Sequence, residues 1–340
     1  MSVEPQLQLV DGYQPPDADE IDRTIEYIFG HRKEALRGFL SSHALPVTGK
    51  KETMRARVVQ ELESGRIRAD ELIGLLDSIE GWGNQHIYLY EAPAGELTTW
   101  KSEAKVRKQL ERAGLVNLFN RRRPLVLPEE PTLSSIEWTP SSIRFIWVEK
   151  REWELRLGDL DTEEDGVIYK AYRNQVARGI TAFDWDLVSG HAALMIQRLP
   201  SGENYDEIRQ AYEEQLEDVL TISNFERVAI RRGIRRIESS SEALNRQIAH
   251  ETKQGNTVSF TSKSRKRDVF SDPDTKKSRN ALGPNTASVL GNFYWLPKAP
   301  RLERNLHVKS YARDLRVGIF GECTEGEVKY VLSRVRHHSK

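Results

Sequence analysis

This 340-residue sequence contains one cysteine, no long apolar run and no excess of charge of either sign. The single cysteine, Cys323, excludes an intramolecular disulfide and is typical of a reducing compartment. The chain has no run of eighteen apolar residues, and its first residues are acidic and proline-containing where an export signal has a basic start and an apolar segment. We therefore expect an intracellular protein of the cytoplasm or nucleoid, or of the nucleus in a eukaryote, with no membrane attachment.

Charge is balanced over the whole chain but not along it. Lys and Arg together number 51, as do Asp and Glu, so the net charge is zero and only a local patch can attract a polyanion. Residues 1–20 carry acidic side chains and no Lys or Arg, whereas residues 221–281 carry an excess of basic side chains. Any nucleic-acid surface is therefore expected on particular segments.

Motifs for catalysis are also missing. The sequence has no Walker-type glycine-rich loop, no GxSxG elbow and no Cys/His cluster with zinc spacing. Two Glu-x-Lys triplets, at Glu251 and Glu327, resemble half of a metal-dependent nuclease motif, which needs a further acidic residue on a preceding strand. Asp184 and Asp186 share one face of an expected strand and are interpreted as exposed, solvating residues. We predict no enzyme, no catalytic residue, no cofactor and no metal ion.

The front of the chain has helical periodicity. Asp19 is expected to cap a helix that presents Ile25 on its apolar face, and Asp70 to cap a later helix that presents Leu72 and Leu76. Two more helices are expected between them, over residues 34–43 and 50–62. The predicted organisation is an acidic flexible tail over 1–17, a helical domain over 18–83, and a connecting strand and helix over 84–132.

The rest of the chain has the two-residue alternation of half-buried strands. Apolar residues alternate with polar ones from Ile136 to Leu199, and successive strands without intervening helices indicate an antiparallel sheet. Helices are expected over 205–220, 225–238 and 325–335, with further strands over 292–296 and 315–320. The predicted fold class is α+β. A helical bundle precedes an antiparallel-sheet domain over 133–340 with flanking helices and a mobile basic loop over 255–285.

The segment between the two central helices of the front domain carries the most specific signal. Pro46 biases Leu45 away from helix, so the chain extends there, and Gly49 tolerates the backbone angles that begin a new helix. Residues 34–62 thus resemble the SAP-type helix-extension-helix DNA-binding motif. That resemblance implies that Lys51 and Arg57 fall on the family's basic positions and Gly49 on its glycine. Ala44 departs from the pattern, where the family often has glycine, as does Val47, where it often has a polar residue.

The mechanics of this motif favour phosphate binding. Free N–H groups at the start of the second helix attract an anion, and nearby cations add to that attraction. The alternatives are a helical protein-interaction module or a helical bundle with a purely structural role. The expected DNA-contacting residues of the motif are Thr48, Gly49, Lys50, Lys51, Arg55 and Arg57.

Two further basic segments are expected to contact the same duplex. One is an arginine stripe on the helix over 225–238, and the other lies in the basic loop; both can equally serve as solvating surface. The residues concerned are Arg231, Arg232, Arg235 and Arg236 on the helix, and Lys263, Arg265, Lys266 and Arg267 in the loop.

The order of elements is also loosely similar to that of the centromere protein N family. The similarity consists of the helix Leu72 to Ile79, the strand Ile87 to Tyr90 and the meander from Ile143 onwards. It implies a helical domain and a sheet domain that together grip DNA, and no individual binding residue.

We therefore predict a non-enzymatic DNA-binding protein that acts as a recruiter or architectural subunit through contacts with the phosphate backbone. Its partners would be double-stranded DNA and either a protein or a second copy of the chain. The alternatives are a protein-protein adaptor subunit or, less favoured, a metal-dependent nuclease subunit of a defence or repair system.

Overall fold

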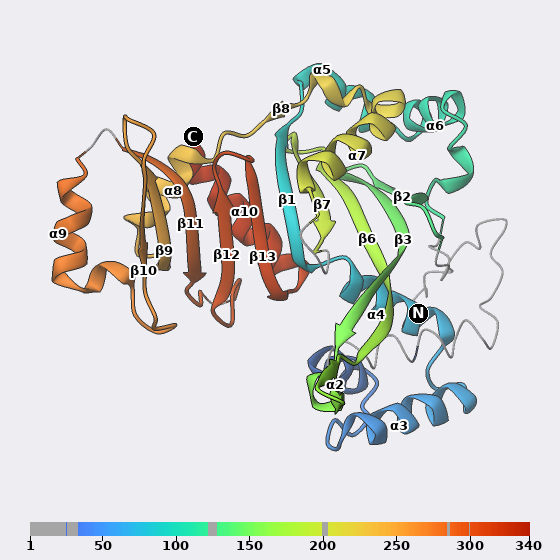
Figure 1. Cartoon of the computed structure of the whole chain (residues 1–340). Coiled ribbons are helices and arrows are strands. Elements are labelled where there is room, and N and C mark those ends of the chain that lie inside the picture. Colours follow the sequence, from blue (N-terminus) through green and yellow to red (C-terminus); the bar gives the residue numbers. More distant parts are fainter. Residues whose placement is uncertain (1–24, 26–32, 122–127, 199–202, 284–285, 299) are drawn as a thin grey trace. The chain divides into compact units, whose positions relative to one another are not determined.

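The computed structural model describes residue 25 and residues 33–121, 128–198, 203–283, 286–298 and 300–340. Within these residues the protein is mixed α/β with one large antiparallel sheet (Figure 1), as the sequence predicts. The chain divides into two compact units, residues 1–81 with 122–125, and residues 82–121 with 126–340. No helix in the described ranges has both the length and the apolar character needed to cross a membrane. The expected acidic tail and the helix start at Asp19 lie outside the described residues.

The first unit contains the helices α2 (Lys33–Ser42), α3 (Lys51–Glu63) and α4 (Ala69–Glu80). The helix α4 begins one residue before Asp70, and its N-cap is Arg68, whose amide donates to the Glu71 carboxylate at 2.7 Å. Asp70 therefore lies in the first turn and is not the cap that the sequence predicts. Apolar residues of the three helices, together with Ile67 between α3 and α4, meet Ile25 in one buried cluster: Leu36, Phe39, Leu40, Met54, Val58, Leu72 and Leu76.

The second unit is built on an eleven-stranded sheet of order β10-β9-β11-β12-β13-β1-β7-β6-β3-β2, in which β8 pairs with β1. Every pairing between these strands is antiparallel. The strands are β1 (Gly83–Glu91), β2 (Thr132–Thr139), β3 (Ser142–Arg156), β6 (Tyr172–Asp186), β7 (His191–Gln197), β8 (Glu226–Arg227), β9 (Ala243–Glu251), β10 (Thr257–Thr261), β11 (Ala287–Trp295), β12 (Leu306–Tyr311) and β13 (Arg316–Glu322).

The two halves of this sheet repeat one topology. In the first half, β1 is followed by the helices α5 (Ala94–Trp100) and α6 (Glu103–Arg112), four meander strands, and the helix α7 (Tyr205–Leu220). In the second half, β8 is followed by α8 (Arg231–Glu238), the strands β9, β11, β12 and β13, and the helix α10 (Glu325–Ser339), with β10 added as a hairpin partner of β9. The first strand of the second half is reduced to two residues, and β1 takes the centre of the sheet.

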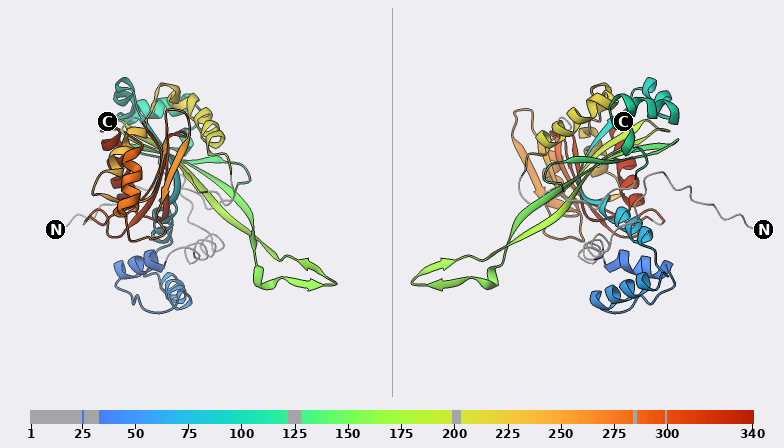
Figure 2. Two further views of the ribbon diagram at one scale, coloured as in Figure 1. Left: turned by 60° about the vertical axis from the view of Figure 1, so that its left-hand side comes forward. Right: turned by 90° about the vertical axis from the view of Figure 1, so that its right-hand side faces the viewer.

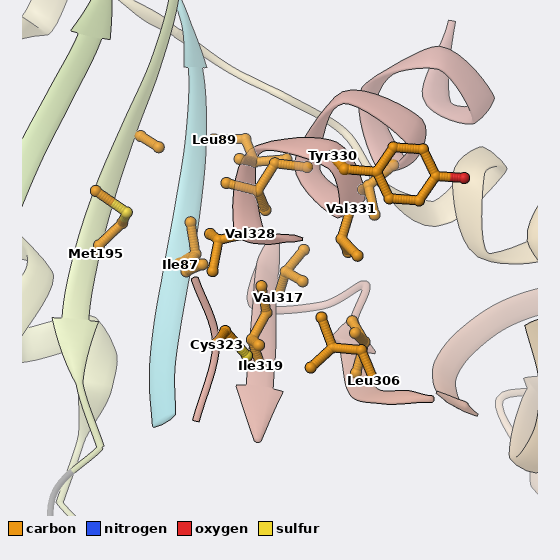
Figure 3. Packing of buried hydrophobic residues seen from close by; sticks show 14 of the residues in the cluster. Ile87, Leu89, Met195, Leu306, Val317, Ile319, Cys323, Val328, Tyr330 and Val331 are labelled. Carbon is orange, nitrogen blue, oxygen red and sulfur yellow. The ribbon is translucent and has the colours of Figure 1, made fainter. Parts of the chain in front are cut away.

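The helices of the two halves cover opposite faces of the sheet. Along β1, Tyr88 and Tyr90 belong to the core under α5, α6 and α7, whereas Ile87 and Leu89 belong to the core under α8 and α10. Figure 3 shows the second core, where Val328 and Val331 of α10 lie over these two β1 residues and their neighbours on β13. The side chains of β1 thus point alternately into two cores, one on each face of the sheet, as expected for a strand buried on both faces.

Three expected elements differ from the observed ones. The predicted helix over 225–238 is the short strand β8 followed by α8, and the strand β12 was not expected. The predicted connector over 84–132 contains all of β1, the central strand, except Gly83, and its described residues belong to the sheet unit. The predicted mobile loop over 255–285 instead contains β10, a 3-10 turn (Val269–Ser271) and α9 (Pro273–Ala281).

Strands β3 and β6 continue beyond the sheet as a two-stranded arm (Figure 2). Their pairing runs to Arg156 and Tyr172, whereas the pairing of β3 with β2 ends at Val148 and that of β6 with β7 ends at Thr181. The arm ends in a small hairpin formed by β4 (Thr162–Glu164) and β5 (Val167–Tyr169). Among the described strands, the arm residues pair only with one another.

Candidate nucleic-acid interface

The segment between α2 and α3 is extended, with alternating burial. Leu45 and Val47 pack against the core of the first unit, whereas Pro46 and Thr48 are exposed. Ala44 has a φ of 55° and Gly49 a φ of 124°, so both ends of the extension need left-handed or otherwise unusual backbone angles. Glycine adopts such angles without steric cost. The departure at Ala44 from the SAP pattern therefore leaves an alanine in a conformation that favours glycine.

Arg57 holds the extension in place. Its Nη1 donates to the carbonyl oxygens of Pro46 at 2.8 Å and of Thr48 at 2.7 Å. The side chain is half-buried and is turned toward the backbone that it supports. The sequence predicts Arg57 as a DNA-contacting residue, but the structure makes it a positioning residue for the segment that would contact DNA.

The start of α3 is open to solvent. Thr48, Gly49 and Lys50 are exposed, and so is Arg55 one turn into the helix. Lys50 is the N-cap residue and makes no side-chain capping hydrogen bond to the first turn, which begins at Lys51. Amides of a first helical turn that lack a cap are available to an anion, and the helix dipole favours negative charge there. The geometry of this end of α3 therefore suits a phosphate group.

The predicted arginine stripe is largely used inside the protein. Arg232 Nη1 donates to the Lys340 carbonyl at 2.7 Å, and Arg236 Nη1 donates to the His338 carbonyl at 3.3 Å. A Cβ on Gly233 would lie 2.4 Å from Ser339 Oγ, so α8 and the end of α10 are in close contact. The last carbonyls of a helix lack intrahelical donors, and cations stabilise that end of the dipole. Arg232 and Arg236 therefore stabilise the C-terminal end of α10, whereas the sequence predicts that they belong to an exposed stripe.

Arg235 and Arg231 complete this helix face. Arg235 is half-buried and its Nη1 lies 3.4 Å from the Thr286 carbonyl, whereas Arg231 is exposed. Only Arg231 and Arg232 of the four predicted contact residues are exposed. A continuous cationic stripe along α8 is therefore not formed.

The basic segment is exposed but anchored. Lys263, Arg265, Lys266 and Arg267 are all exposed. The Asp268 carboxylate, directly after them, accepts hydrogen bonds from the backbone and side-chain amides of Asn245 and from the Phe270 amide, each at 2.7 Å. The segment is thus hydrogen-bonded to β9, and its Lys and Arg side chains are exposed to solvent.

The acidic residues of the nuclease alternative have structural roles. Glu327 caps α10 by accepting from the Thr324 amide at 2.9 Å, and Glu251 pairs with Arg313 at 2.8 Å. Asp184 is not the exposed residue that the sequence suggests: its side chain is 14% exposed and lies 3.8 Å from Lys329 Nζ, and burial raises its pKa. Within the described ranges, no three His, Cys, Asp or Glu residues are grouped so that they could hold a metal ion.

One charged surface was not predicted from the sequence. It lies on the face of β11, β12 and β13 opposite to α8 and α10, and these strands are far from β1 in the sequence. The only local signal is the alternation of His307, Lys309 and Tyr311 on one face of β12. No protein-family model matches the chain, and no curated protein matches it significantly.

Proposed function

We propose that this protein binds double-stranded DNA through the phosphate backbone and acts as a recruiter or architectural subunit. The observation that carries the proposal is the uncapped start of α3, which Arg57 presents by holding the preceding extension. Thr48, Gly49 and Lys50 would contact phosphates there, together with Arg55 and the amide of Lys51. The SAP-like sequence of residues 34–62 supports the same reading.

The basic segment would add phosphate contacts through Lys263, Arg265, Lys266 and Arg267. All four are exposed in a chain whose net charge is zero, so they form a local source of positive potential. Contacts of this kind carry little sequence information, which fits an architectural role. Catalysis is not part of the proposal.

The test is an equilibrium titration of labelled duplex DNA at several salt concentrations. Each phosphate contact should contribute about −0.9 to the slope of log affinity against log salt, so contacts at Lys50 and Arg55 alone predict a slope of about −2 or steeper. Binding that is absent at low salt, or that does not depend on salt, would contradict the proposal.

A protein-protein adaptor is the second candidate function, and the arm favours it. Isolated two-stranded hairpins are marginally stable in water, and exposed apolar clusters mark interaction sites. The arm exposes Leu160 by 61% and Ile168 by 62%, together with Leu155, Val167, Tyr169, Tyr172 and Val176. Absence of DNA binding, combined with a light-scattering mass well above 39.1 kDa, would favour this role over the first.

A further inference from the structure

Among the described residues, the helices leave one face of the second half of the sheet uncovered. The helices α5, α6 and α7 cover one face of the first half of the sheet and stop at β1, and α8 and α10 cover the opposite face of the second half (Figure 1). Within the described part of this unit, no helix covers the remaining face of β11, β12 and β13. Register places Tyr294, His307 and Phe320 on that face, in neighbouring strands.

Aromatic rings form a continuous row across this open face. The ring centroids of Tyr294 and His307 are 5.0 Å apart, and those of His307 and Phe320 are also 5.0 Å apart. The row continues from Phe320 to His86 on β1 at 5.8 Å, and from His86 to Tyr205 at the start of α7 at 3.9 Å. We call these five residues the aromatic row. His86 is buried, and the other four residues are half-buried.

Cations lie among these rings. The Arg316 guanidinium stacks between Tyr205 and Tyr311, 4.8 Å and 4.5 Å from the two ring centroids, and is also paired with Asp314 at 3.0 Å. The exposed Arg198 lies 5.6 Å from the Phe320 ring. Lys309 is opposite Gly318 in the register and therefore projects from the same face as Phe320.

Burial and neighbouring positive charges both lower the pKa of the two histidines of the row. Burial and the charges of Arg316, Arg198 and Lys309 lower the pKa of His86 to about 3. Burial and the charges of Lys309, Arg265 and Arg246 lower the pKa of His307 to about 4. The rings are therefore uncharged at neutral pH, and the local field comes from the Lys and Arg side chains. Arg265 belongs to the basic segment, so the charge of that segment also acts on His307.

We propose that this open face is a second nucleic-acid site, which takes single-stranded DNA or RNA. Unpaired bases extend the stack at the half-buried Tyr294 and Phe320, and phosphates contact Lys309, Arg198 and Arg265. Base stacking on aromatic side chains beside a cationic groove is the general basis of single-strand binding. A duplex matches the cations only, because its bases are already stacked on one another, and an acidic peptide likewise offers charge without planar groups. The site does not depend on the helix pair of the first unit.

The experiment uses the full chain and three labelled probes: thymidine and uridine oligonucleotides of about 15 nucleotides, and a duplex of the same length. Tyr294→Leu should lower affinity for the single strands about fivefold or more, since a ring that stacks a base is lost. Tyr294→Phe keeps the ring and should bind like the wild type. Lys309→Gln should reduce the salt slope for single strands by about 0.7 and leave duplex affinity unchanged. The ratio of thymidine to uridine affinity shows which nucleic acid the face prefers.

Several outcomes would overturn this proposal. One is the absence of single-strand binding; another is wild-type affinity in both Tyr294→Leu and Lys309→Gln. Displacement of the thymidine oligonucleotide by poly-glutamate, as effectively as by unlabelled oligonucleotide, would show an acidic-peptide site instead. The Lys50→Glu/Arg55→Glu variant separates the two sites. Loss of single-strand binding in that variant would place single strands on the helix pair and contradict the open-face site. If the wild type binds single strands but not duplex DNA, only the proposed function of the helix pair is rejected.

Discussion

Replacing Lys50 and Arg55 together by glutamate is expected to lower the affinity for duplex DNA by about tenfold or more, which corresponds to about 1.4 kcal/mol. Both side chains are exposed at the open start of α3, and the substitutions place negative charge where phosphates would bind. Duplexes of different sequence should lose affinity alike, because phosphate contacts carry no sequence information. Fluorescence anisotropy with two unrelated duplexes measures both effects.

The matched control is Lys105→Glu/Lys108→Glu. These two lysines are exposed on α6, and the double substitution changes the net charge by the same amount. Affinity in this control should remain within about twofold of the wild type, because neither lysine belongs to a proposed contact surface and the effect of net charge alone is weakened by salt. Equal losses in the two variants would show that net charge, and not the start of α3, governs binding.

Arg336→Met is expected to cost about 3–5 kcal/mol of the free energy of unfolding, the largest effect we foresee for a single side chain. Arg336 is 5% exposed and lies on α10. Its Nη1 donates to the Tyr90 carbonyl at 3.0 Å and to the Glu91 carboxylate at 2.8 Å, and its Nη2 donates to the Ala192 carbonyl. It thereby ties the last helix to β1 and β7. Methionine would leave these acceptors without their donor.

Urea unfolding followed by circular dichroism measures this loss. Arg334→Met is the comparison on the same helix: Arg334 pairs with Glu242, and its side chain is 26% exposed, so the expected cost is about 1 kcal/mol or less. Arg336→Lys should fall between the two, since one ammonium cannot reach all three acceptors. Similar costs for Arg336→Met and Arg334→Met would contradict the role of Arg336 as a buried tie between α10 and the sheet.

Local patterns predicted α7 to the residue. Its apolar positions are uninterrupted at helical spacing, Tyr212 and Leu216 are buried as expected, and Asn204 caps the first turn through the Asp206 amide. The mixed fold and the antiparallel meander were also predictable, because strand alternation is a local property.

The predicted helix over 225–238 shows why some other elements could not be predicted from local patterns. Phe225 packs against Trp185 at 5.0 Å in the core under α7, whereas Ile230, Ile234 and Ile237 belong to the core under α10. The chain crosses the sheet at β8 between these positions. Helical spacing continues across that crossing by coincidence, so periodicity alone could not show where the helix begins.

The sites depend on distant contacts to different degrees. The extension and the start of α3 could be anticipated from Pro46 and Gly49, because their backbone preferences act locally. The use of Arg232 and Arg236 at the end of α10 involves carbonyls more than a hundred residues away. The open face likewise joins β1 to β11, β12 and β13, and only the strand order brings these residues together.

Photo-crosslinking from position 48 tests most directly whether the helix pair contacts DNA. A photoreactive amino acid replaces Thr48, which is exposed on the extension, and a second protein carries it at Lys105 of α6. The proposal predicts a crosslink to duplex DNA from position 48 that disappears as salt is raised, and none from position 105. DNA binding with no crosslink from position 48 would place the interface elsewhere on the protein and contradict the proposed function of the helix pair.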